Sequence, residues 1–212
     1  MKLGQKAMEA LQKEITGKLC SGDDLVVAGP VGFEGTVLLV RNEKDFLREF
    51  FSEGFLWNAV REPEFDFREI IGEEKISAVC QPGTGGILAA IWKMAEVSGV
   101  GLRADLRKIP IRQETIEICE HFDLNPYKLL AGGCILLGCP DGQEAVNVFM
   151  EAGIRAAVIG KAVQGNDRLL KSGELTRYLE RPSQDEITKF PWGNQWKSSG
   201  RIPGKENQEG NK

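Results

Sequence analysis

The stretch Ala78-Val79-Cys80-Gln81-Pro82-Gly83-Thr84-Gly85-Gly86-Ile87 carries a short apolar run into a helical pattern through a glycine-rich turn. Apolar residues over 76–80 predict a strand, and the pattern over 87–98, with Gly99 behind it, predicts a helix. This arrangement favours anions, because backbone N–H groups point outward and the helix dipole adds positive charge. The same glycines also permit a tight turn that packs the helix closely on a sheet, so both interpretations stay open.

Composition and charge exclude several classes of protein. Hydrophobic residues make up 42% and charged residues 27% of the 212 residues, which is typical of a globular protein. The net charge of -4 and the pI near 5.3 disfavour a duplex nucleic acid partner. No apolar run approaches the roughly 18 residues that cross a membrane, and the N-terminus lacks the apolar core of a signal peptide. We therefore expect a cytoplasmic protein that binds neither nucleic acid nor membrane.

The cysteines and the histidine predict neither a disulfide framework nor a metal site. The number of cysteines is odd, no CxxC motif occurs, and the sequence has a single histidine, His121. The five cysteines are interpreted as small buried side chains in a reducing compartment: Cys20, Cys80, Cys119, Cys134 and Cys139. We expect His121 to pack or hydrogen-bond rather than to catalyse. No metal ligand and no catalytic residue is assigned.

Apolar periodicity predicts strands that alternate with helices along most of the chain. Strands are expected near 25–28, 76–80, 100–106, 134–138 and 156–160, with weaker ones near 168–170 and 176–179. Helices are expected over 42–51, 87–98, 112–121 and 141–152, whereas 32–40 fits a helix or a strand and 126–130 a short helix or a turn. This order predicts a three-layer α/β/α domain of the α/β (α+β) class, with a split βαβ unit of ferredoxin-like type.

Three parts are expected along the chain. Residues 1–20 predict an amphipathic helix, because Leu3, Ala7, Met8, Leu11, Ile15 and Leu19 recur at helical spacing. Residues 21–182 predict one compact domain. Residues 183–212 are polar and predict a disordered tail, since they cannot bury enough apolar surface to offset the entropy of ordering. Within that tail, Trp192 and Trp196 fit either local packing or docking to a partner.

Long motifs give the chain a family resemblance. They are Ile109-Pro110-Ile111-Arg112-Gln113-Glu114-Thr115-Ile116-Glu117, Leu124-Asn125-Pro126-Tyr127, Ala156-Ala157-Val158-Ile159-Gly160 and Gly165-Asn166-Asp167-Arg168, with further matches over 22–27 and 32–36. Across about 21–182 the sequence resembles the C-terminal domain of the aminoimidazole ribonucleotide (AIR) synthetase superfamily, most of all its hydrogenase-maturation, carbamoyl dehydratase-like branch. The resemblance implies a three-layer α/β/α domain with a partly ferredoxin-like topology.

The resemblance also implies features for which this sequence shows no match. The family places an ATP- and magnesium-binding domain with an acidic, glycine-rich motif before this one, and no such motif occurs here. At the glycine loop, the family's His-Asp and Thr stand as Cys80, Gln81 and Gly83, of which only the thiol titrates. The hydrogenase-maturation branch uses a reactive C-terminal cysteine, and no cysteine follows Cys139. We therefore expect no cofactor for the chain alone, and ATP with magnesium only where a partner chain supplies the ATP domain.

The expected binding partner is a small anionic or phosphorylated ligand. The candidate ligand-binding residues belong to the glycine loop, to the start of the helix at 112 and to the loop 131–133: Gly83, Thr84, Gly85, Gly86, Arg112 and Gly133. Three hypotheses about function stay open. The chain is a ligand-binding or regulatory protein without autonomous ATP-dependent catalysis, the substrate-side subunit of a split ATP-dependent enzyme, or a protein-interaction module that uses its N-terminal helix and its tail. A homodimer and a partner chain with the ATP domain are both compatible with them.

Overall fold

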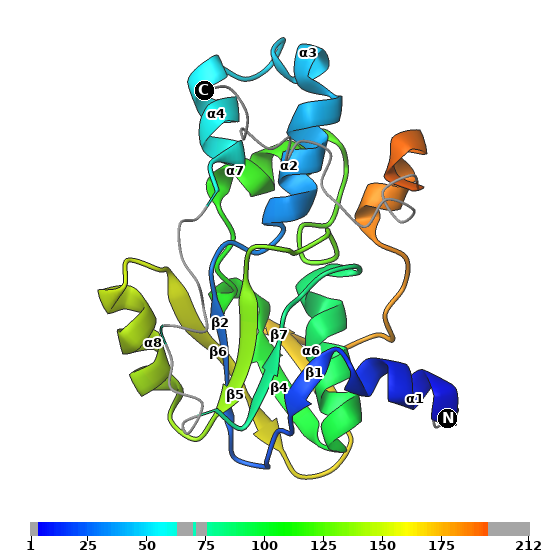
Figure 1. Ribbon diagram of the computed structural model, residues 1–212, viewed down its shortest axis with the longest axis vertical. Coiled ribbons are helices and arrows are strands. Elements are labelled where there is room, and N and C mark those ends of the chain that lie inside the picture. The colour runs from blue at the N-terminus through cyan, green and yellow to red at the C-terminus, as the bar shows by residue number, and fades with distance from the viewer. Residues whose placement is uncertain (1–3, 63–69, 71–75, 195–212) are drawn as a thin grey trace, which may run out of the picture.

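The structure, a computed structural model, describes residues 4–62, 70 and 76–194. An eight-stranded sheet with the order β1-β3-β5-β2-β6-β4-β7-β8 forms the centre of this part (Figure 1). The strands are β1 (Ile15–Gly17), β2 (Asp24–Ala28), β3 (Ala78–Cys80), β4 (Gly101–Asp105), β5 (Ile135–Cys139), β6 (Ala156–Val163), β7 (Arg168–Ser172) and β8 (Leu175–Tyr178). All neighbouring strands are antiparallel except β4 and β7.

The order and direction of strands β2, β5 and β6 confirm the predicted split βαβ unit. Strand β2 pairs antiparallel with both β5 and β6, so β5 and β6 run in the same direction with β2 between them. Helix α8 (Gly142–Glu151) connects β5 to β6, and Asp141 caps its start by accepting a hydrogen bond from the backbone N–H of Glu144 at 2.9 Å. The topology is therefore partly ferredoxin-like, as the sequence predicts.

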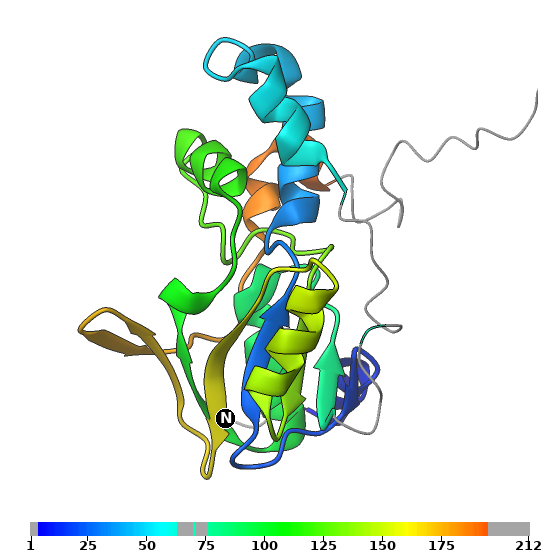
Figure 2. The same cartoon turned by 90° about the vertical axis from the view of Figure 1, so that its left-hand side faces the viewer.

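Helices cover both faces of the sheet, which gives the predicted three layers. Helix α6 (Gly86–Ser98) packs on one face and α8 on the other (Figures 1 and 2). Alternate side chains of β2 pack in the core under α6 and in the core under α8, because successive residues of a strand point to opposite faces. Leu25 and Val27 join the core under α6, whereas Val26 and Ala28 pack with Phe149 of α8.

A third core lies beyond one end of the sheet, in the upper part of Figure 1. It is built by α2 (Phe33–Asn42), α3 (Lys44–Leu47), α4 (Glu53–Val60) and α7 (Gln113–His121), with buried Leu39, Leu47, Ile118 and Leu129. Segment 32–40, which the sequence left open, is therefore a helix. The helix predicted over 42–51 forms only over α3, and 126–130 is a turn. The short 3₁₀ helices are η2 (Leu106–Lys108), η3 (Glu186–Lys189) and η4 (Pro191–Asn194).

The N-terminal helix is shorter than the sequence predicts. Helix α1 (Gln5–Gln12) ends before Ile15, and β1 then pairs with β3 at the edge of the sheet. Ile15 and Leu19 are buried in the core under α6 instead of lying on one helix face. Both residues keep helical spacing with the preceding apolar positions, so periodicity alone could not separate the strand from the helix. Leu3 lies outside the described residues.

The segment 183–194 departs from the predicted disordered tail. Asp185 and Ile187 are buried at 2% and 1% exposure, and Trp192 packs against the third core. The indole N–H of Trp192 donates a 2.6 Å hydrogen bond to the Glu43 carboxylate. The composition did not predict that this segment packs on the domain, because only a few apolar and capping residues fix it onto a surface formed by the rest of the chain. Trp196 and residues 195–212 lie outside the described residues.

Candidate ligand-binding site

The sheet brings most of the predicted site residues to one of its ends. Strands β2, β3 and β4 run in the same direction, since β2 and β3 are both antiparallel to β5, and β2 and β4 are both antiparallel to β6. Their carboxyl ends face the helices of the third core (Figure 1). The glycine loop follows β3, Gly29-Pro30 follows β2, and η2 with Arg112 follows β4.

The glycine loop is a close-packed turn. Gly85 and Gly86 have φ angles of +82° and +70°, which L side chains rarely adopt. A Cβ on Gly86 would overlap the carbonyl oxygen of Tyr127, and a Cβ on Gly85 would lie 2.8 Å from that of Ala89. Gly83 is under no such constraint, because its φ is negative and nothing lies within 4 Å of an added Cβ. The sequence signal at Gly85 and Gly86 is thus partly explained by packing of α6 on the turn before β5.

A carboxylate from the chain itself already stands at the start of α6. Asp185 accepts hydrogen bonds from the backbone N–H groups of Gly85 (2.6 Å), Leu130 (3.1 Å) and Ile187 (3.0 Å). Burial raises the pKa of Asp185 from its ordinary value of 3.8, against the lowering effect of these three hydrogen bonds. In this structure the backbone N–H of Gly85 therefore already bonds a carboxylate of the chain itself, that of Asp185.

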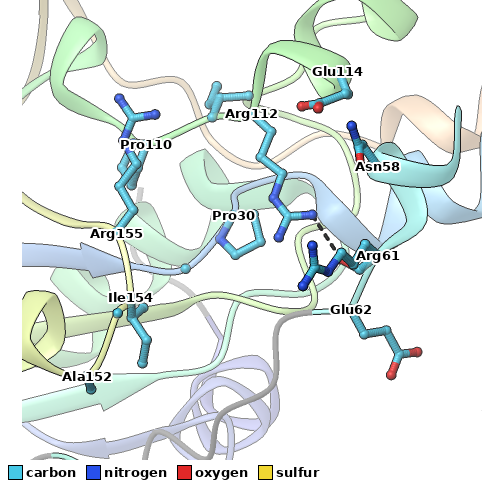
Figure 3. A pocket seen from close by; sticks show the side chains of 13 residues that line it. Pro30, Asn58, Arg61, Glu62, Pro110, Arg112, Glu114, Ala152, Ile154 and Arg155 are labelled. Atoms are coloured by element: carbon cyan, nitrogen blue, oxygen red, sulfur yellow. Dashed lines mark hydrogen bonds between the residues drawn. The ribbon is translucent and has the colours of Figure 1, made fainter. Parts of the chain in front are cut away.

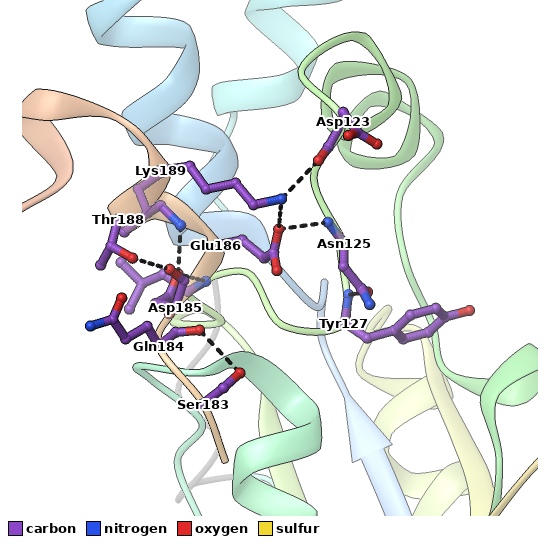
Figure 4. A network of polar contacts seen from close by, with 11 residues as sticks. Asp123, Asn125, Tyr127, Ser183, Gln184, Asp185, Glu186, Thr188 and Lys189 are labelled. Carbon is purple, nitrogen blue, oxygen red and sulfur yellow. Dashed lines mark hydrogen bonds and ion pairs between the residues drawn. The ribbon is translucent and has the colours of Figure 1, made fainter. Parts of the chain in front are cut away.

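The segment that carries Asp185 is anchored on both sides (Figure 4). Glu186 accepts a hydrogen bond from the backbone N–H of Asn125 at 3.2 Å and pairs with Lys189 at 2.7 Å. The Lys189 ammonium also donates to the carbonyl oxygen of Asp123 at 2.9 Å. Asp185 caps η3 through Ile187, and an Asp just before a short helical turn was the sequence signal that could have revealed this contact.

A second carboxylate lies close to the same loop. Glu34, in the first turn of α2, is half-buried, and a Cβ on Gly132 would overlap its carboxylate. Burial raises the pKa of Glu34, a backbone hydrogen bond from Gly132 lowers it, and the negative charge of Asp185 raises it. Gly133, a predicted site residue, has a φ of +94° and lies against the ring of Phe33. The sequence did not single out Glu34 as a site residue, although Glu34 lies within the family-like stretch 32–36.

The side chains at the family's titratable loop positions do not supply an acid or base. Cys80 is buried, and burial raises the pKa of its thiol to about 11. Gln81 and Thr84 are exposed and do not ionise near neutral pH. Burial likewise raises the thiol pKa of Cys119, to about 12, and of Cys139, to about 11. Cys134 is also buried, so four of the five cysteines have the predicted structural role and Cys20 is exposed.

Arg112 lies apart from the glycine loop, in a cavity of about 510 Å³ (Figure 3). The ring of Phe33 lies between the two places, with the Arg112 guanidinium 5.2 Å from its centroid and Gly133 against its edge. Arg112 donates a 3.0 Å hydrogen bond to the carbonyl oxygen of Arg61. Burial lowers the pKa of Arg112, and the neighbouring charges of Glu114 and Arg61 raise and lower it respectively. Arg61 and Arg155 also line the cavity, and the sequence singled out neither.

The part of the chain that the structure describes also bears on metal clusters, the histidine and membrane spans. No group of three or more His, Cys, Asp and Glu side chains there is arranged to hold a metal ion. His121 packs among the rings of Phe46, Phe50 and Phe51, with centroid distances of 5.3, 4.2 and 5.9 Å. No described helix is long and apolar enough to cross a membrane.

Comparison with known proteins extends the family resemblance. The carbamoyl dehydratase HypE of Rhizobium leguminosarum bv. viciae is 28% identical over 146 residues, which cover 67% of this chain and 41% of that protein. A putative hydrogenase expression/formation protein of Methanocaldococcus jannaschii is 29% identical over 148 residues, covering 68% and 43%. The chain thus spans less than half the length of these relatives.

Solved structures share the fold at low sequence identity. A crystal structure of the hydrogenase maturation protein HypE superposes with a TM-score of 0.65 at 17% identity, covering 78% of this chain and 55% of that one. The structure of a HypE-HypF complex gives a TM-score of 0.60 at 17% identity, covering 78% and 54%. Residues 21–170 match the family described as AIR synthase related protein, C-terminal domain, and the chain therefore belongs to that family.

Proposed function

We propose that this chain is a ligand-binding or regulatory domain of the AIR synthase related family, which takes a small anionic or phosphorylated ligand and performs no ATP-dependent chemistry on its own. The observation that carries the proposal is Asp185 on the backbone N–H of Gly85. The contact supports a role for the loop in holding an oxyanion through fixed backbone dipoles, without a side chain that gains or loses a proton.

The chemistry near the loop supports binding over catalysis. A general acid or base works best when its pKa lies near the operating pH and its proton is within reach of the ligand. The Cys80 thiol has a pKa of about 11 and is buried, and Asp185 uses both carboxylate oxygens on backbone donors. Glu34 is the one half-buried carboxyl that adjoins the loop, and the backbone hydrogen bond from Gly132 engages it.

The contacts of Asp185 with the loop also suit a regulatory role. A phosphate that binds the Gly83–Gly86 turn requires the Asp185 carboxylate to leave, because both groups use the N–H of Gly85. Departure of Asp185 would also free the Leu130 amide and loosen η3, so ligand binding would be coupled to the position of segment 183–194. Such coupling would report occupancy of the loop to any partner that contacts this segment.

Calorimetry with magnesium and ATP tests the absence of autonomous chemistry. We expect no heat of binding up to millimolar ATP and no phosphate release by the purified chain. The Asp185→Asn variant should bind inorganic phosphate several-fold more tightly than wild type if the loop takes ligand anions, because the competing charge is removed. Micromolar, magnesium-dependent ATP binding by the chain alone would contradict the proposal.

A second candidate function is the substrate-side subunit of a split ATP-dependent enzyme, which works with a partner chain carrying an ATP domain. One solved relative is a complex of HypE with HypF, which supports a role in an assembly of two chains. Mixing the chain with such a partner should give a complex in size-exclusion chromatography and ATP hydrolysis that neither chain shows alone. A self-associating chain would instead elute at twice its mass of 23.4 kDa without any partner.

A further inference from the structure

We propose that the cavity lined by Arg61, Arg112 and Arg155 binds the phosphate group of a small phosphorylated molecule. This inference rests on the proposed function, in that the chain binds an anionic ligand, and it moves the site from the glycine loop to the other side of Phe33. The two sites differ in kind. The loop offers the backbone N–H of Gly85, which Asp185 already uses, whereas the cavity offers charged side chains.

Three arginines line this cavity and come from separate parts of the chain. Arg61 is the C-terminal cap of α4, Arg112 the N-terminal cap of α7, and Arg155 directly precedes β6. In Figure 3 the guanidinium groups of Arg61 and Arg112 lie close together, whereas that of Arg155 lies across Pro30 from them, beside Pro110. Among the residues that the structure describes, the ion pairs are formed by other cations, and none of these three arginines has a carboxylate within 4 Å. Arginines that line one cavity without a paired carboxylate leave their charge available for an anion.

The cavity holds Arg112 in a fixed place. Its guanidinium stacks on Phe33 and donates to the Arg61 carbonyl oxygen, which uses one of its five N–H donors. The Arg61 guanidinium faces it in Figure 3 and itself lies over the ring of Trp57 at 5.6 Å. Burial and the charge of Arg61 both lower the pKa of Arg112, so bringing a dianion between them would relieve repulsion between like charges. A prearranged donor loses less entropy on binding.

Two carboxylates at the cavity do not cancel this charge. Glu62 is exposed, and its carboxylate points away from Arg112 and Arg155 in Figure 3. Glu114 lies in the first turn of α7 and attracts Arg112, as its effect on the Arg112 pKa shows, without forming an ion pair with it. With three cations and two carboxylates, the lining keeps a net positive charge.

The shape of the cavity favours a phosphate ester over a free anion. A volume of about 510 Å³ lies within the roughly 300–1,000 Å³ of small-molecule sites and exceeds what a single phosphate fills. Pro30, Pro110 and Ile154 line it beside the arginines and offer apolar contact to the rest of the molecule. A phosphomonoester carries about −1.5 to −2 charges at pH 7, and arginine matches its oxygens in pairs. The occupant is therefore expected to combine one phosphate with an apolar or sugar-sized body.

Titration of the full chain with three probes tests this site. Ribose 5-phosphate, inorganic phosphate and succinate are compared by calorimetry, with phosphorus NMR line broadening for the first two. We expect ribose 5-phosphate to bind more tightly than inorganic phosphate, and succinate to bind weakest because its carboxylates are spread apart. Affinity should fall as salt rises, since the attraction is ionic.

Matched variants locate the binding. Arg155→Gln should weaken ribose 5-phosphate binding about tenfold or more, as loss of one hydrogen-bonded charge pair does. Arg155 is exposed, and its side chain forms no hydrogen bond or ion pair with another described residue, so the variant should keep the wild-type melting temperature. Arg112→Gln should weaken binding at least as much. Arg103→Gln is the control, because Arg103 is an exposed arginine on β4 outside the cavity, and it should leave affinity within twofold.

The outcomes separate this inference from the proposed function. Binding that Asp185→Asn strengthens and Arg155→Gln leaves unchanged would place the ligand on the glycine loop, so the cavity inference would be wrong and the proposed function would stand. Equal losses of affinity for ribose 5-phosphate in Arg155→Gln and Arg103→Gln would indicate a general charge effect and overturn the cavity site. The absence of binding by every phosphate probe would also overturn it, while the ATP titration judges autonomous chemistry separately.

Discussion

The glycine loop and the arginine cavity lie at the same end of the sheet, and both attract negative charge by different means. At the loop, the backbone N–H of Gly85 at the start of α6 donates to the buried Asp185 carboxylate, which comes from 100 residues further along the chain. At the cavity, Arg61, Arg112 and Arg155 line one space without an ion pair among the described residues. A ligand at the loop has to displace an anion of the chain itself, whereas a ligand at the cavity meets arginines that have no paired carboxylate.

Substitutions at the glycine loop and at the arginine cavity are expected to have different effects. Gly85, Gly86 and Asp185 at the loop are buried, so substitutions of these residues should act on stability first. The three arginines of the cavity are half-buried or exposed, so their substitution should act on binding first. The following predictions, from the largest expected effect to the smallest, test the stability side of this contrast.

The largest effect is expected at Gly86. The Gly86→Ala variant should lower the free energy of unfolding by about 3 kcal/mol, because Ala is strained at positive φ and its Cβ overlaps the Tyr127 carbonyl oxygen. Gly83→Ala is the matched control in the same loop, where an added Cβ meets nothing within 4 Å, and it should change stability by less than about 0.5 kcal/mol. Urea unfolding followed by circular dichroism measures both. Equal stabilities of the two variants would show that the turn is not held as described.

A smaller loss is expected at Asp185. Asp185→Asn keeps the size of the side chain but replaces an acceptor oxygen with an amide group, which leaves a buried backbone N–H without a partner. The free energy of unfolding should fall by about 2 kcal/mol. The control is Asp167→Asn, an exposed aspartate in the turn before β7. If both variants unfold at the same urea concentration as wild type, the carboxylate does not hold segment 183–194 on the loop.

The smallest effect is a pH dependence at Glu34. Burial raises its pKa above the ordinary value of 4.5, so the folded state binds the proton more tightly than the unfolded state does. Its contribution to stability is therefore complete below about pH 4.5 and is lost as the pH rises through the folded-state pKa. Glu34→Gln does not ionise, so its stability relative to wild type should be greater at pH 7.5 than at pH 4.5.

Solvent limits the size of this pH effect, since Glu34 is only half-buried. Glu174→Gln provides the control, because Glu174 is exposed in the turn between β7 and β8 and should show no such dependence. Thermal unfolding at both pH values measures the difference between each variant and wild type. A Glu34→Gln difference that does not change with pH would mean that the carboxyl group is solvated in the folded protein.

Local patterns were sufficient for the central elements. Gly99 ends α6 with a φ of +69°, and Asp141 caps α8, as their positions beside apolar repeats predict. The buried runs of β2 and β5 are continuous because both faces of these strands are covered, and such runs are visible in the sequence. The family resemblance added the fold, and the structure agrees with the three-layer arrangement.

The sequence by itself determined which segments form the layers and predicted an anion at the loop 83–86. Only the tertiary structure decided which anion stands there and where the arginines gather. Asp185 and Gly85 are 100 residues apart, and Arg61, Arg112 and Arg155 belong to three separate elements. Periodicity and capping are properties of neighbouring residues, whereas these contacts depend on how the sheet places distant strand ends side by side. Charge at a site is set by that placement, and no local pattern encodes it.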